Sequence, residues 1–229
     1  MLFVGSKFDF RAYLLIANTK PYSVYYRFGH VRRCMRPYNV TTDEKKVHVC
    51  NDYSDELENP NFPINEHIWP YERFEEYLIK ESGFTPEQVH DGFVTNMKRL
   101  FLGVFRSVQN HISRKNGYWL LCGVDIAVDA EWGLHVLEVN TNPSLHYGTE
   151  VWGRGIVERN YRIAAETLEL VLDAHYKAPP FRTEPVLESE LVMRTLYGYE
   201  LIYSDQVSPP YAASQDACYD PVPVTIKQS

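Results

Sequence analysis

Two β-rich runs near the middle of the chain, separated by a short polar turn, constrain the fold more than any other feature of the sequence. Residues 118–128 and 134–140 are rich in aliphatic and aromatic side chains, and the five residues between them include Asp129 and Gly133. A short polar turn between two such runs is typical of a β-hairpin. The sequence therefore predicts two antiparallel strands here, and with them a sheet.

Acidic and amide side chains recur at alternate positions of this predicted hairpin. Successive residues of a strand point to opposite faces, so Asp125 faces away from its apolar neighbours, while Glu138 and Asn140 share one face. Two carboxylates that meet across strands repel each other unless a cation relieves the repulsion. Oxygen ligands of this kind suit Mg²⁺. These residues therefore predict a metal site, although acidic residues in a hairpin are also typical of its solvated face.

A second alternating segment, residues 8–16, predicts another strand that ends at the break from Asn18 to Pro21. Lys7, Asp9 and Arg11 fall on one face of it, opposite apolar side chains. Basic groups on one surface can neutralise a polyphosphate, and a guanidinium can stabilise a phosphoryl group during transfer. A surface ladder of ion pairs is the alternative explanation.

Residues 22–35 predict a further hairpin, which turns at Gly29 and His30. Arg27 and Arg32 flank this turn. They could contact a phosphate, a substrate carboxylate or an acidic polypeptide, and ordinary solubility would also account for them.

The rest of the chain reads as a loop, two helices and a tail. Residues 41–70 are rich in Asn, Asp, Glu and Pro, and we expect a loop there in which His48 and Asn51 either lie near a nucleotide or are structural. Apolar spacing predicts one helix that begins at Thr85 and ends near Asn116 and Gly117, and another over residues 155–176. Residues 179–229, rich in Pro, Tyr, Ser and Asp, are predicted to be an extension or tail.

Composition excludes several classes of protein. The chain has 229 residues, of which 45% are hydrophobic, enough for one sizeable core, and its net charge of −7 provides no basic footprint for nucleic acid. No apolar run approaches the roughly 20 residues that span a bilayer. The four cysteines form no CxxC motif, which favours a reducing compartment. We therefore expect a cytoplasmic protein that binds neither nucleic acid nor membrane.

Several motifs, in this order and spacing, resemble the tubulin-tyrosine-ligase-like family over about residues 5–176. They are Lys7-Phe8-Asp9-Phe10-Arg11-Ala12-Tyr13, the segment from Tyr26-Arg27 to Val31-Arg32, His48-Val49-Cys50-Asn51, Gly123-Val124-Asp125, and Leu137-Glu138-Val139-Asn140-Thr141-Asn142-Pro143-Ser144-Leu145. Cys50 stands where the family commonly has a threonine.

The resemblance implies an α/β (α+β) fold of the ATP-grasp-like type, with a mainly antiparallel sheet flanked by helices. Residues 1–178 would form a partial ATP-grasp domain, equivalent to the middle segment and C-terminal lobe, with the N-terminal lobe missing before Lys7. Residues 179–229 would be a C-terminal extension or tail. ATP and Mg²⁺ are the implied cofactors. The implied roles are metal binding by Asp125, Glu138 and Asn140, nucleotide contact by Lys7, Asp9, His48 and Asn51, and catalysis by Arg11 and Arg32.

By the same resemblance, the protein would be an amino-acid ligase that acts on tubulin. ATP would phosphorylate a carboxylate, and an amino group would attack the acyl phosphate to form an amide bond. The implied partners are tubulin, through its acidic tails, and a free amino acid, at the cytoskeleton or cilium. Glycylation, glutamylation and tyrosination stay open, as do a catalytically incomplete fragment or pseudoenzyme that binds tubulin, and an ATP-grasp ligase for a small metabolite.

Overall fold

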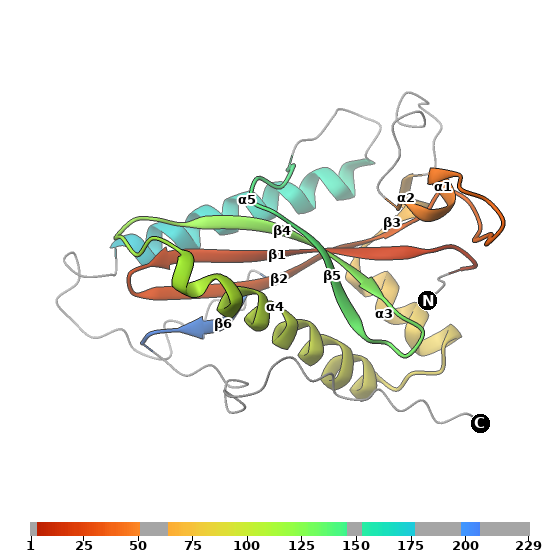
Figure 1. Cartoon of the computed structure of the whole chain (residues 1–229), viewed down its shortest axis with the longest axis horizontal. Helices are drawn as coiled ribbons and strands as arrows, with labels where there is room; N and C mark the ends of the chain where they lie inside the picture. Colours follow the sequence, from red (N-terminus) through yellow and green to blue (C-terminus); the bar gives the residue numbers. More distant parts are fainter. Residues whose placement is uncertain (1–3, 51–63, 146–152, 177–197, 207–229) are drawn as a thin grey trace.

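The computed structural model describes residues 4–50, 64–145, 153–176 and 198–206, which form one sheet with helices on both faces (Figure 1). Among these residues the strand order is β3-β2-β1-β4-β5, and β6 joins the outer edge of β2; every neighbouring pair is antiparallel. The strands are β1 (Phe8–Thr19), β2 (Tyr22–Arg33), β3 (Ile68–Trp69), β4 (Leu120–Val128), β5 (Leu134–Asn140) and β6 (Glu200–Ser204). The expected α/β architecture with a mainly antiparallel sheet is confirmed.

The longer helices lie on opposite sides of this sheet, with α5 above it and α4 below it in Figure 1. They are α3 (Tyr71–Glu81), α4 (Thr95–Val108) and α5 (Gly153–Tyr176). The shorter ones are α1 (Lys45–His48), α2 (Ile64–His67), the π-helical turn η1 (Gln88–Val94) and the 3₁₀ turn η2 (Gln109–His111). None of the described helices is both long enough and apolar enough to cross a membrane.

Alternation along β1 builds two apolar cores. Phe10 and Leu14 point to one face, where they pack with residues of α3 and α4 such as Phe74, and the rings of Phe10 and Phe74 lie 5.1 Å apart. Leu15 points to the other face, where it packs in a smaller core with Ile163 of α5. Each fully buried side chain of this size stabilises the fold by about 1.5–3 kcal/mol.

A bulge at Gly29 replaces the turn that the sequence predicts there. β2 continues through this residue, and its partner in the hairpin is β1. Arg11 pairs with His30 whereas Ala12 pairs with Phe28, so Gly29 is the extra residue of the bulge. A Cβ atom on Gly29 would lie 2.6 Å from the carbonyl oxygen of Arg11. The predicted hairpin within residues 22–35 is therefore wrong, because a glycine between two apolar runs indicates a bulge as readily as a turn.

Other predicted elements are confirmed or refined. The hairpin of residues 118–140 is β4 and β5, and the second predicted helix is α5. The helix predicted from Thr85 begins as η1 and becomes α-helical only at Thr95. α3 has no counterpart among the predicted elements, and β6 arises within the stretch predicted to be a tail. The described parts of the predicted loop contain α1, α2 and β3, while residues 51–63, Asn51 included, lie outside the described residues.

A disulfide joins Cys34, just after β2, to Cys50, just after α1. Both residues are buried, and 16 positions separate them in the sequence. The spacing of the cysteines does not predict this bond, because the two residues meet only after β2 and the segment with α1 have folded against each other. Cys122, which faces the larger core, is a buried free thiol.

Candidate functional site

Two arginines and two aspartates form a network on the sheet face that α5 covers. Arg11 of β1 pairs directly with Asp125 of β4, and its guanidinium donates to both carboxylate oxygens through Nε and, at 3.0 Å, Nη2. Arg32 of β2 lies 2.6 Å from Asp9 through Nε and 3.0 Å from Asp125 through Nη2. The carboxylate of Asp125 therefore contacts the guanidinium groups of both arginines, and Arg32 contacts the carboxylates of both aspartates.

Burial makes this network strongly dependent on its pairing. Asp125 is 2% exposed, Arg32 5% and Asp9 8%. A buried charge is tolerated only when an opposite charge and hydrogen bonds compensate its lost hydration. With Arg11 included, two negative and two positive charges cancel. The repulsion that the sequence predicts between carboxylates is thus relieved at Asp125 by arginines within the chain.

The pKa values of the two aspartates move in opposite directions. Burial raises the pKa of Asp9 above its ordinary value, and the charge of Arg32 offsets only part of that rise. Burial acts the same way on Asp125, but hydrogen bonds and charges from Arg11 and Arg32 outweigh it and lower the pKa. Burial disfavours the charged form of Arg32, yet Asp9 and Asp125 outweigh it and raise its pKa. Asp9 therefore takes up a proton at a higher pH than Asp125 does.

Glu138 and Asn140 extend the network toward solvent on β5. Glu138 pairs directly with Asp125 across the strands, so the two carboxylates share one face, as the alternation predicts. Asn140 donates from Nδ2 to Oε1 of Glu138 at 2.9 Å. Glu138 is exposed, and its charge comes in addition to the neutral set of four. This corner of the sheet therefore carries a net negative charge.

The donor set at this corner suits a hard cation. Two carboxylates and an amide supply oxygen ligands only, and Mg²⁺ in proteins is commonly held by one or two carboxylates and completed by water and phosphate oxygens. The exposed Glu138 carboxylate has oxygen lone pairs available beyond its bond with Asn140. No cluster of three or more His, Cys, Asp or Glu suitable for a metal occurs in the described part of the chain. The predicted set of Asp125, Glu138 and Asn140 contains only two carboxylates, and its metal-binding role stays a prediction.

Gly123 lets the Arg11 side chain lie across β4. Gly123 pairs with Asn140 and lies on the same face as Asp125. A Cβ atom there would lie 2.9 Å from Cβ of Pro143 and 3.3 Å from Nη1 of Arg11. Sequence reasoning did not assign Gly123 this role, although a glycine inside an apolar strand often marks a close approach of another group.

Lys7 and His48 lie in a neighbouring cluster around Tyr38. The Lys7 ammonium is 5.3 Å from the centre of the Tyr38 ring, and the rings of Tyr38 and His48 are 6.0 Å apart. His48 contacts the carbonyl oxygen of Thr42 through Nε2 at 2.7 Å. Cys34 links this cluster to the network, because it follows β2 and donates its backbone N–H to the Lys7 carbonyl oxygen.

The structure thus divides the predicted site residues into two groups. One network brings together six of them: Asp9, Arg11, Arg32, Asp125, Glu138 and Asn140. Lys7 and His48 belong to the cluster around Tyr38, and Asn51 lies outside the described residues.

The fold and this network define an α/β protein of the ATP-grasp-like type, with charged side chains gathered on one face of an antiparallel sheet. The chain belongs to the tubulin-tyrosine ligase family, whose sequence model matches residues 1–158.

Relatives of the chain carry the names of glycylases. The chain is 28% identical over 206 residues to the protein polyglycylase TTLL10 of Rattus norvegicus, which covers 87% of the chain and 30% of that protein. It is 29% identical over 183 residues to the inactive polyglycylase TTLL10 of Homo sapiens, covering 78% and 27%. It is 26% identical over 180 residues to the tubulin monoglycylase TTLL3 of Homo sapiens, covering 76% and 22%. The chain thus spans less than a third of the length of each of these relatives.

Proposed function

We propose that the protein is an ATP- and Mg²⁺-dependent ligase that attaches amino acids to tubulin through amide bonds. One observation carries the proposal: Asp125 lies between two arginines and directly across the strand pair from Glu138, in a chain of the tubulin-tyrosine ligase family. The names of the relatives favour glycine as the amino acid and tubulin as the acceptor. We expect the protein to act in the cytoplasm, at microtubules.

In this proposal, Asp125, Glu138 and Asn140 hold the metal. The bound metal and nucleotide supply the phosphoryl group and neutralise its charge, as in other phosphoryl-transfer sites. Arg11 and Arg32 stabilise the negative charge that develops during transfer. Lys7 and His48 contact the nucleotide from the neighbouring cluster. No side-chain nucleophile is needed, so the protein acts through positioning and electrostatics.

The paired arrangement of the arginines supports this division of roles. Asp125 accepts hydrogen bonds from both Arg11 and Arg32. It therefore keeps one cationic partner when the other guanidinium binds an anionic substrate. Glu138 has no arginine partner in the network, which leaves its carboxylate available for a metal.

Replacement of Glu138 tests the proposal. In Glu138→Gln the shape is kept and the metal-binding charge is lost, so the rate of amino-acid incorporation should fall by about 100-fold or more, while the melting temperature stays within about 2 °C of the wild type. The measurement is ATP-dependent incorporation of labelled glycine, glutamate or tyrosine into tubulin, beside thermal melts with and without Mg-ATP. Glu131→Gln, in the exposed β4–β5 turn, is the matched control and should be neutral.

Near-normal incorporation by Glu138→Gln would refute the metal role of this residue. A wild-type protein that incorporates no amino acid, and that Mg-ATP does not stabilise, would contradict the ligase proposal itself. Incorporation into a small amine in place of tubulin would instead indicate a ligase for a small metabolite.

A tubulin-binding module without catalysis is the second candidate. The observation that favours it is the name of the human relative, which describes an inactive polyglycylase. Cosedimentation with microtubules separates the two candidates when it is measured beside nucleotide binding: a module sediments with microtubules and shows no stabilisation by Mg-ATP.

A further inference from the structure

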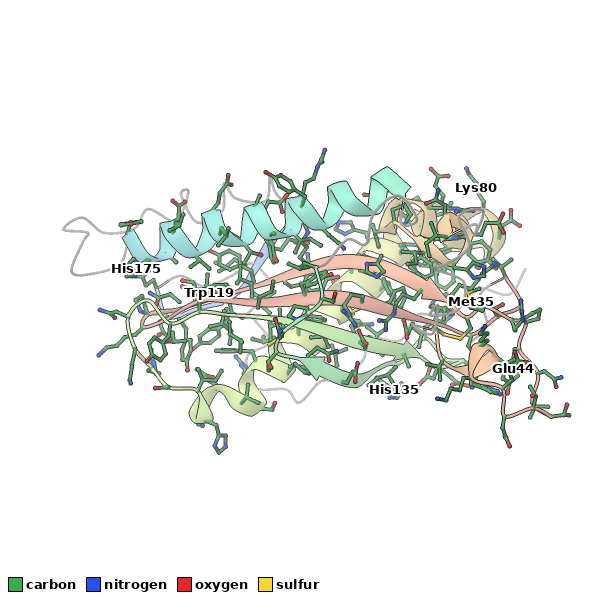
Figure 2. The ribbon with its side chains drawn as sticks, turned by 90° about the horizontal axis from the view of Figure 1, so that it is seen from above. Met35, Glu44, Lys80, Trp119, His135 and His175 are labelled. Atoms are coloured by element: carbon green, nitrogen blue, oxygen red, sulfur yellow. A yellow bond between two sulfur atoms is a disulfide. The ribbon has the colours of Figure 1, made fainter. Side chains whose placement is uncertain are left out.

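The disulfide joins the two groups of predicted site residues. Cys34 lies two positions after Arg32, which belongs to the ion network. Cys50 lies two positions after His48, which belongs to the cluster around Tyr38. Both cysteines are buried, at the end of the molecule where Figure 2 labels Met35 and Glu44. One covalent bond therefore fixes the segment between the cysteines beside the network.

This segment, residues 36–49, has few other anchors. The structure describes every one of these residues, and Val47 is the only side chain among them that is buried. α1 is a single turn of four residues, and no side chain caps its N-terminus. The backbone N–H of Tyr38 donates to the carbonyl oxygen of Gly5 at 2.9 Å. Segments with so little apolar burial open easily, so the disulfide is a main restraint on this one.

A disulfide is uncommon in the compartment where we expect the protein to act. Glutathione and thioredoxin keep cytosolic thiols reduced, and the disulfides found there are usually transient, catalytic or redox-sensing. Cys50 also stands where the family commonly has a threonine, so the bond is not a general feature of the family. A permanent structural cross-link is therefore the less fitting explanation of this bond.

We propose that Cys34 and Cys50 form a reversible redox switch, which fixes residues 36–49 when it is oxidised and releases them when it is reduced. The oxidised form holds the Tyr38 ring 5.3 Å from the Lys7 ammonium and 6.0 Å from the His48 ring. A cluster that is fixed before binding loses less conformational freedom on binding. The oxidised form therefore binds Mg-ATP more tightly, a consequence that rests on the proposed function.

Thiol–disulfide exchange with glutathione accounts for every atom and electron of the switch. A glutathione thiolate attacks the sulfur of Cys50, which is 6% exposed, whereas Cys34 is 0% exposed. The bond between the cysteines breaks, and Cys34 leaves as a thiolate that takes up a proton. A second glutathione thiolate attacks the mixed disulfide, so Cys50 is released and oxidised glutathione forms. The reverse sequence transfers two electrons back and restores the bond.

The third cysteine of the described residues is a poor competitor in this exchange. Cys122 is buried in the larger core, and burial raises its pKa to about 11. Only the thiolate form of a cysteine attacks a disulfide. Cys122 therefore keeps its proton and stays out of the reaction at neutral pH.

The test is a redox titration of the full chain in glutathione buffers. The ratio of reduced to oxidised glutathione is raised from about 1 to about 10 000 at a total of about 5 mM. Free thiols are then alkylated, and mass spectrometry quantifies each cysteine peptide, including that of Cys218, which lies outside the described residues. The bond between Cys34 and Cys50 should change from mostly formed to mostly reduced within this range.

Backbone NMR and calorimetry measure what the switch does. Reduction should shift the amide signals of residues 36–49 and leave those of β4 unchanged. The reduced form should bind Mg-ATP about fivefold more weakly than the oxidised form. Cys34→Ala and Cys50→Ala should each behave like the reduced form at every glutathione ratio. Cys122→Ala, which keeps the disulfide, is the matched control and should switch like the wild type, and thermal melts establish that each variant is folded.

Four results would overturn the inference. A bond that persists over the whole range of ratios would be a permanent cross-link, and free thiols at every ratio would mean that no bond forms. Unchanged amide signals of residues 36–49 on reduction would show that the segment is not released. Equal affinity of both forms for Mg-ATP would remove the control of the site. If neither form binds Mg-ATP, the proposed function fails together with the effect on affinity, while the thiol titration and the NMR signals still decide the switch itself.

Discussion

The sheet face that α5 covers has two halves of opposite character on the same strands. Toward the end of the molecule where Figure 2 labels Trp119 and His175, Leu15 packs with Ile163 in an apolar core. Toward the end where Met35 is labelled, alternate positions of β1 carry Asp9 and Arg11 in the ion network. One alternation thus serves two purposes: exclusion of water in one half and precise placement of charge in the other.

The two halves contribute differently to stability. Apolar burial stabilises the fold by about 25 cal/mol for each Å² removed from water. In a buried ion network, the attraction between charges is largely offset by their lost hydration, so the intact network adds little while a broken one costs much. We therefore expect a substitution that leaves a charge of the network without its partner to lower the free energy of unfolding strongly. In the apolar half, we expect the loss to be proportional to the side-chain volume removed.

The largest expected effect follows removal of the bridging cation. Arg32→Met leaves Asp9 and Asp125 buried without their shared partner, which should lower the free energy of unfolding by about 3–5 kcal/mol at neutral pH. Urea denaturation measures this change in the free energy of unfolding. Arg36→Met, at an exposed position just after β2, is the control and should change stability by less than about 0.5 kcal/mol. A loss below about 1 kcal/mol for Arg32→Met would erase the contrast between the halves.

The apolar half is tested by Leu15→Ala, at a side chain with 0% exposure. The cavity and the lost burial should cost about 2–4 kcal/mol. Because no charge is involved, this cost should be the same at about pH 4 and pH 7, whereas the cost of Arg32→Met should shrink as the aspartates take up protons. Equal pH dependence in the two variants would contradict the comparison.

A smaller effect is expected where the halves meet. Gly123→Ala introduces a methyl group against Pro143 and Arg11 and should cost about 1–3 kcal/mol. Gly103→Ala in α4 is the matched control, since a Cβ atom there would contact nothing within 4 Å. In a helix this control should be stabilising by about 0.5–1 kcal/mol. Thermal or urea unfolding of both variants decides the point.

The smallest effect separates Asp9 from Asp125 by the sign of their pH dependence. Asp125 has a lowered pKa, so its stabilising contribution is present above about pH 4 and is lost as the pH falls further. Asp9 has a raised pKa, so its charged form is disfavoured in the fold and its contribution declines as the pH rises above its unfolded pKa.

Unfolding of Asp125→Asn and Asp9→Asn between about pH 3 and pH 6 measures these trends. The stability gap to the wild type should widen with pH for the Asp125 variant and narrow for the Asp9 variant, by on the order of 1 kcal/mol. Parallel trends would show that the two carboxylates titrate as equivalents.

Alternation in the sequence predicts much of this arrangement. It assigns Asp125 and Glu138 to one face, and it separates Asp9 and Arg11 from the side of their strand that faces the larger core. These predictions succeed because the alternation of side chains between the two faces of a strand depends only on neighbouring residues. The ion pairs are not local: Arg11 and Asp125 are 114 positions apart, and only the pairing of β1 with β4 brings them together.

The bulge at Gly29 shows where simple alternation along a strand predicts the wrong face. Without it, Arg27 and Arg32, five positions apart, would point to opposite faces of β2. The extra residue at Gly29 puts both arginines on the α5 side while Phe28 and Val31 both reach the core. Nothing in the local pattern distinguishes this bulge from a turn, because the distinction depends on how closely β1 approaches Gly29.

α3 could have been predicted from the spacing of Phe74 and Leu78, which fill one apolar face. That signal is weak because α3 directly follows the polar segment of residues 41–70, which the sequence predicts to be a loop.

The disulfide between Cys34 and Cys50 makes the intervening segment a covalently closed ring. That ring includes the exposed basic residue Lys45, which is suitable for tryptic cleavage, whereas Pro37 blocks cleavage after Arg36. A single cut there would break one peptide bond, but the disulfide would still hold the two pieces together. Under oxidising conditions the two pieces therefore migrate as one molecule, and a reductant releases them. A nicked molecule would thus keep the end of β2 attached to the segment that carries His48, and its integrity on a gel would depend on the redox state of the sample.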